Sequence, residues 1–125
     1  MDNVKTYTLM IVGSDARFIY LMRYYAQSTG HSVVVAPIDG DVVILAAKER
    51  AATIILDPDL VESASLDLLQ ALKSNPTTCA IPVLVCSWQD EAASLLAQDA
   101  DQYLQKPVSY EAFLTALKEM VCVSV

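Results

Sequence analysis

The chain has 125 residues, which is enough for one domain with a single hydrophobic core. A formal net charge of −7 and only 8 scattered Lys and Arg residues argue against nucleic-acid binding through this domain and against an anionic membrane surface. The 3 cysteines lack C-x-x-C spacing, the first residues do not resemble a signal peptide, and no apolar run reaches membrane-spanning length, so we expect a cytoplasmic protein.

Short apolar runs alternate with segments of helical periodicity. The first half of the chain predicts, in order, a strand over 6–12, a helix over 16–28 stopped by Gly30, a strand over 32–36, a helix from the cap 39–41 to about Arg50, and a strand over 53–56. The second half predicts a helix capped by Ser63 or Ser65 and ended at 75–76, a strand over 82–86, a short helix over 90–98, a strand over 102–105, and a last helix capped by Ser109.

This alternation has no linker, repeat or low-complexity segment, so residues 1–125 are expected to form one domain. Five β–α units with short connections predict an α/β fold with a doubly wound, parallel five-stranded sheet. Its crossovers are right-handed, and its helices cover both faces.

Polar side chains stand where three of the predicted strands end. Asp57 follows the apolar run 53–56, Ser87 follows the strand over 82–86, and Lys106 follows the strand over 102–105. Parallel strands end at one edge of a sheet, and ligands bind there in open α/β sheets. A carboxylate, a hydroxyl and an ammonium at that edge form a phosphoryl site, in which the carboxylate attacks phosphorus and the other two groups stabilise the phosphoryl oxygens.

With these residues in place, the chain resembles the receiver domain of bacterial two-component response regulators over nearly its whole length. The resemblance rests on the strand into Asp57 and on the runs 81–87 and 101–107. It implies strand order 2-1-3-4-5, Asp57 as phosphoacceptor, and Ser87 and Lys106 as the groups that follow the phosphoryl group. It also implies a switch or partner face over about 90–121, with Tyr103 as the aromatic residue that reports the state.

Several positions depart from the receiver pattern. Receivers place two adjacent acids after the first strand to hold Mg²⁺, and here Gly13 and Ser14 occupy those positions, so Mg²⁺ binding is expected to be weakened. Asp57 with Asp15 or Asp59 offers a weak substitute, since Mg²⁺ often needs only one or two carboxylates; Asp15 is equally suited to cap the first helix. Trp88 replaces a small residue, as a lid on the site or part of a partner surface, and the segment between Ser87 and Lys106 is a few residues short.

Two other functions remain alongside the phosphoacceptor. In a pseudo-receiver the fold persists as a protein–protein interaction module, and Lys106 pairs with Asp57 as a purely structural cation. A phosphatase of the haloacid dehalogenase type is disfavoured, because Val61 stands where its motif, begun by Asp57 and Asp59, expects a hydroxyl residue. The protein is therefore not expected to be an enzyme.

The resemblance also predicts the partners. A histidine kinase or a histidine phosphotransfer protein would donate the phosphoryl group, and an effector protein or a missing output domain would respond to it. The apolar ending over 120–125 indicates that a homodimer partner or a further domain covers it.

Overall fold

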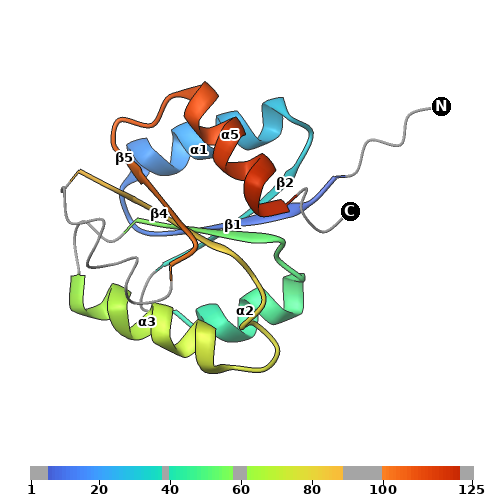
Figure 1. The fold of residues 1–125 in the computed structure, drawn as a ribbon, viewed down its shortest axis with the longest axis vertical. Coiled ribbons are helices and arrows are strands. Elements are labelled where there is room, and N and C mark those ends of the chain that lie inside the picture. The colour runs from blue at the N-terminus through green and yellow to red at the C-terminus, as the bar shows by residue number, and fades with distance from the viewer. Residues whose placement is uncertain (1–5, 38–39, 58–61, 89–99, 122–125) are drawn as a thin grey trace.

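The computed structural model describes residues 6–37, 40–57, 62–88 and 100–121. Five parallel strands form one sheet in the order β2-β1-β3-β4-β5, which confirms the predicted architecture. Two pairs of helices enclose the sheet, α1 and α5 on one face and α2 and α3 on the other (Figure 1). The elements are β1 (Thr8–Val12), α1 (Ala16–Ser28), β2 (Ser32–Ala36), α2 (Val42–Glu49), β3 (Thr53–Leu56), α3 (Glu62–Ser74), β4 (Val83–Ser87), β5 (Gln102–Gln105) and α5 (Tyr110–Val121).

The sheet separates two hydrophobic cores. Successive strand residues point to opposite faces, so β1 sends Met10 and Val12 to the α2 and α3 side and Leu9 and Ile11 to the α1 and α5 side. Burial on both faces explains why the strands read as continuous apolar runs rather than alternating ones. No helix in the described ranges combines the length and apolar character needed to cross a membrane.

Two predicted strands have shifted ends. β1 begins at Thr8 rather than at residue 6, because the N–H of Tyr7 is donated to His31 Nδ1 at 3.1 Å instead of to a neighbouring strand. β4 covers 83–87 rather than 82–86, because Pro82 has no N–H to donate. At its other end, Ser87 pairs with Gln105 of β5.

The helix ends follow the predicted signals in part. Gly30 has a φ of +84° just after α1, and Ser109 Oγ accepts the N–H of Ala112 at 3.1 Å at the start of α5. The predicted serine caps of α3 are wrong: the helix begins at Glu62, ahead of both serines, and an acidic residue is favourable in the first turn of a helix. Asp41 precedes α2 without a side-chain cap bond, because its ψ of 66° departs from the extended conformation of a capping residue. The helix expected over 90–98 lies outside the described residues.

Asp101 joins three segments ahead of β5. Its Oδ2 accepts the N–H of Val83 and the Lys73 ammonium, each at 2.8 Å, while its own N–H is donated to the Val83 carbonyl at 2.9 Å. Lys73 also donates to the carbonyl of Ile81 at 2.9 Å. One carboxylate, directly before β5, therefore ties the end of α3 to the start of β4.

The contact between His31 and Tyr7 predicts a pH dependence of stability. Burial lowers the pKa of His31 below its usual value of 6.5, and its Nδ1 must stay unprotonated to accept the Tyr7 N–H. The unfolded chain therefore binds a proton at higher pH than the folded one. The resulting stability is complete above pH 6.5 and is lost as the pH falls toward the folded pKa.

We expect urea unfolding at pH 7.5, 6.5 and 5.5 to give a free energy of unfolding that becomes smaller as the pH is lowered in wild type. The decrease should be smaller in His31→Gln, whose side chain does not titrate. Equal slopes in the two proteins would contradict the assignment.

Candidate functional site

The sequence-predicted residues Asp57, Ser87 and Lys106 come together at the carboxyl edge of the sheet. The N–H of Asp57 is donated to Val12 O at 2.9 Å, and that of Lys106 to Ser87 O at 2.8 Å, so the sheet pattern continues one residue beyond β3 and β5. The solvent-exposed fraction of each residue is small: 5% for Asp57, 4% for Ser87 and 6% for Lys106. Three polar side chains are therefore buried side by side at the edge where open α/β sheets bind ligands.

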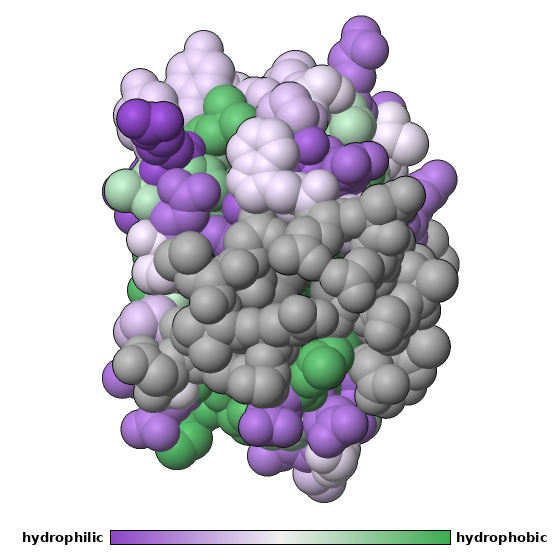
Figure 2. Space-filling model, turned by 90° about the vertical axis from the view of Figure 1, so that its left-hand side faces the viewer, coloured by the Kyte–Doolittle hydropathy of each residue, from purple (hydrophilic) through white to green (hydrophobic). Residues whose placement is uncertain are grey.

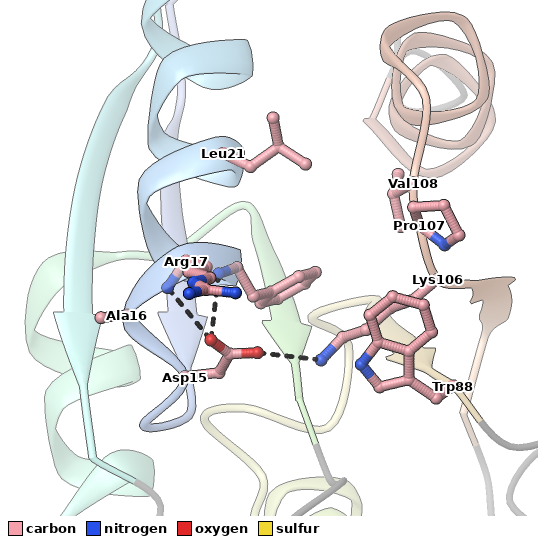
Figure 3. A pocket seen from close by; sticks show the side chains of 9 residues that line it. Asp15, Ala16, Arg17, Leu21, Trp88, Lys106, Pro107 and Val108 are labelled. Atoms are coloured by element: carbon pink, nitrogen blue, oxygen red, sulfur yellow. Dashed lines mark hydrogen bonds and ion pairs between the residues drawn. The ribbon is translucent and has the colours of Figure 1, made fainter.

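An ion pair lies at the centre of this site. The Lys106 ammonium is 2.9 Å from Asp57 Oδ1, and the two side chains are 3% and 1% exposed. The same ammonium is 3.8 Å from Asp15 Oδ2, at the first turn of α1, and 4.4 Å from the centre of the Phe18 ring (Figure 3). Lys106 thus neutralises the buried Asp57 carboxylate and faces a second carboxylate and an aromatic ring.

Gly13 packs directly against Asp57. A Cβ built at Gly13 would lie 2.8 Å from Asp57 Cβ and 3.3 Å from its Oδ2. Asp57 Cβ is fixed to the backbone, so such a contact would require a shift of the main chain. Receivers usually have an acid at this position. The glycine found here lets the Asp57 carboxylate lie against the end of β1.

The two described carboxylates proposed for Mg²⁺, Asp57 and Asp15, both face the Lys106 ammonium. Asp15 takes the second role predicted for it: its Oδ1 caps α1 by accepting the N–H groups of Arg17, at 3.0 Å, and Phe18, at 3.4 Å. Asp57 Oδ1 faces the Lys106 ammonium, and Asp59 lies outside the described residues. Within the described ranges, no three His, Cys, Asp or Glu side chains are grouped as metal ligands. Mg²⁺ would therefore compete with Lys106 for the Asp57 and Asp15 carboxylates, which agrees with the weakened binding expected from the sequence.

Tyr103 and Trp88 flank the site from different directions. Tyr103 is half-buried against the core on the α2 and α3 side, and its hydroxyl is donated to the carbonyl of Ser87 at 3.4 Å. Trp88 follows Ser87 and keeps 57% of its surface exposed, with its ring centre 6.0 Å from the Lys106 ammonium. The Trp88 ring therefore stands beside the ion pair without sealing it.

Comparisons with known proteins place this geometry in a known fold. No protein-family profile matches the sequence. Protein PilH of Pseudomonas aeruginosa is 26% identical over 116 residues, which cover 90% of this chain and 96% of PilH. A response regulator from Chloroflexus aurantiacus has a TM-score of 0.85 at 22% identity, covering 94% of this chain and 99% of that chain. This chain has the fold of a receiver domain. A receiver domain of a Pseudomonas aeruginosa sensor histidine kinase, solved with magnesium in its active-site cleft, has a TM-score of 0.82 at 16% identity, covering 94% and 99% of the chains.

A pocket of about 600 Å³ opens beside the ion pair. It lies between the first two turns of α1 and the segment from Lys106 to Val108, with Trp88 at its edge (Figure 3). The surface seen from the strand-end side mixes hydrophilic and weakly polar side chains with scattered apolar ones (Figure 2). The lining of the pocket itself combines apolar side chains with the charged residues Asp15, Arg17 and Lys106.

Sequence reasoning missed two contacts of the site, those of Phe18 and Gly13. Phe18 belongs to the helix predicted over 16–28 and is 5% exposed, but that prediction does not place its ring under the Lys106 ammonium. In the sequence, Gly13 stands out only as a position where receivers usually have an acid. Its occurrence directly after a buried strand was a usable signal, since a glycine there often marks a close approach of two chain segments.

Proposed function

We propose that this receiver domain acts in a two-component phosphorelay and accepts a phosphoryl group on Asp57. The observation that carries the proposal is the meeting of Asp57 and Lys106, 2.9 Å apart, with Ser87 at the same strand edge. The similarity to a response regulator and to a kinase receiver domain supports it. The donor would be a histidine kinase or a histidine phosphotransfer protein, and the output would pass through β5 and α5 to an effector, an output domain or a second copy.

Each side chain has a role in the proposed transfer. An Asp57 carboxylate oxygen forms a bond to phosphorus as the phosphorus–nitrogen bond of the donor phosphohistidine breaks, and the electron pair stays on the histidine nitrogen. Lys106 then exchanges part of its contact with Asp57 for the new phosphoryl oxygens, and the Ser87 hydroxyl donates to one of them.

Charge repulsion makes this transfer slow. A phosphoryl group carries about two negative charges, and each repels the Asp57 carboxylate by roughly 4 kcal/mol at about 4 Å with an effective dielectric near 20. Since every ~1.36 kcal/mol changes a rate about tenfold, leaving one such term uncompensated slows transfer about a thousandfold. Lys106 supplies one positive charge, but that charge already serves Asp57 in the resting protein.

The direct test is incubation with acetyl phosphate and Mg²⁺, followed by intact-mass measurement. We expect a slow gain of one phosphoryl group in wild type and in Asp41→Asn, which removes an exposed carboxylate at the start of α2. Asp57→Asn should gain none. No gain in wild type, or the same gain in Asp57→Asn, would remove the phosphoacceptor role.

The closed geometry of the site favours one alternative, a phosphorylation-independent interaction module. The Asp57 side chain is 1% exposed and held between Lys106 and Gly13. A domain of this kind would bind its partner equally well in wild type and Asp57→Asn, with or without the phosphodonor. A partner affinity that changes on phosphorylation would exclude it.

A further inference from the structure

The pocket beside Lys106 has an apolar side and a charged side. Figure 3 shows Leu21 on α1 facing Pro107 and Val108 across the opening, whereas Asp15 and Lys106 lie together near Trp88. A volume of about 600 Å³ falls in the range of roughly 300–1,000 Å³ that is usual for small-molecule sites. Such sites combine apolar walls with a few polar groups that fix the orientation of the ligand.

Three of the charges around the pocket face partners within the protein and together carry a net charge of −1, since Lys106 is shared by two carboxylates. Lys106 lies 2.9 Å from Asp57 Oδ1 and 3.8 Å from Asp15 Oδ2, while Asp15 Oδ1 is occupied by the helix cap. Arg17 also lines the pocket and is exposed, and its guanidinium makes no ion pair within the described part of the chain. The cation open to a ligand is therefore the planar guanidinium of Arg17, which lines the pocket together with Asp15, whose side chain is 35% exposed.

We propose that this pocket binds a small organic carboxylic acid with a flat apolar body. The carboxylate would contact Arg17, because a guanidinium and a carboxylate match each other as planar, two-point partners. The body would lie between Leu21 and the Pro107–Val108 segment, one turn along α1 from Arg17, with one face against the exposed ring of Trp88. A single open cation favours a monoanion over a phosphate dianion.

The test uses the isotope-labelled full chain and two matched probes, 1-naphthoate and its neutral isostere 1-naphthamide, followed by amide chemical shifts. We expect saturable shifts from naphthoate centred on residues 16–21, Val108 and the Trp88 indole. The dissociation constant should be on the order of 1 mM, as ligand efficiency gives for about 13 non-hydrogen atoms. Naphthamide should bind at least about fivefold more weakly, because it lacks the charge that pairs with Arg17.

Three variants identify the contacts. Arg17→Ala should weaken naphthoate about fivefold and remove most of its advantage over naphthamide. Arg23→Ala removes the same charge from an exposed position of α1 outside the pocket and should change neither affinity. Trp88→Ala should weaken both probes. Shifts that do not saturate, shifts centred elsewhere, or equal effects of Arg17→Ala and Arg23→Ala would overturn the proposal whether or not Asp57 is phosphorylated.

Discussion

Replacing Lys106 with methionine is expected to lower the free energy of unfolding by about 3–5 kcal/mol, because the substitution leaves the Asp57 carboxylate buried without its cation. Both side chains of this pair are nearly inaccessible to water, at 3% and 1% exposure, so solvent cannot replace the lost ammonium. Methionine keeps most of the length and apolar surface of the lysine stem, which restricts the change to the charge. Urea unfolding at pH 7 measures the loss. The slope of the free energy of unfolding against urea concentration is compared between wild type and variant, because an unchanged slope shows that only stability has changed.

Two further variants separate the charge effect from a general effect of losing a lysine. Lys118→Met removes an exposed lysine of α5 and should change stability by no more than about 0.5 kcal/mol. The double variant Asp57→Asn, Lys106→Met should recover most of the loss, since it leaves no buried charge unpaired. If the stability loss of the double variant equals the sum of the losses of Asp57→Asn and Lys106→Met measured singly, the ion pair does not account for the loss in Lys106→Met.

The second large effect is expected at Gly13. Gly13→Ala should lower the free energy of unfolding by about 1–3 kcal/mol, because the added Cβ meets Asp57 Cβ at 2.8 Å and neither atom can rotate away. At an unstrained site the same substitution usually stabilises a protein by about 0.4–1 kcal/mol, so the sign itself is diagnostic. Denaturant unfolding of Gly13→Ala beside Ser14→Ala, a change at the adjacent exposed residue, checks it. A gain in stability would show that the close approach to Asp57 is absent.

The same contact determines what restoring the receiver acids would do. Gly13→Asp adds a carboxylate to the steric conflict and should lose more stability than Gly13→Ala, whereas Ser14→Asp should be tolerated. In the double variant Gly13→Asp, Ser14→Asp, isothermal titration with Mg²⁺ should therefore show no gain in affinity unless the variant also loses stability, because the new aspartate side chain at position 13 displaces Asp57. Tight Mg²⁺ binding with unchanged stability would contradict this account.

The sequence predicted the fold well where chain-local signals control it. The bounds of α1, β2, β3 and β5 were predicted correctly, because their apolar runs are interrupted by charged or turn-forming residues. The start of β1 depends on His31, 24 positions from Tyr7, and no local pattern contains that hydrogen bond. The helix at Glu62 began earlier than the serines indicated, since a cap signal does not fix which of several nearby residues begins the helix.

For the site, the sequence predicted which residues meet but not how they meet. Three strand-end side chains share one edge because all strands are parallel, and that inference needs no side-chain geometry. The position of Phe18 under Lys106, the approach of Gly13 to Asp57 and the choice of Asp15 as a cap depend on how α1 lies against the sheet. That arrangement is a property of packing, and periodicity does not encode it.

Asp101 has a consequence for the alignment of the strand that leads to Lys106. Because its carboxylate and N–H both engage Val83, the register of β5 beside β4 is fixed by a local anchor rather than by the length of the chain that leads to it. This anchor lies ahead of β5, so it also sets where Lys106, directly after β5, donates its N–H to the Ser87 carbonyl. A carboxylate outside the site thereby aligns the lysine with the buried acid it neutralises.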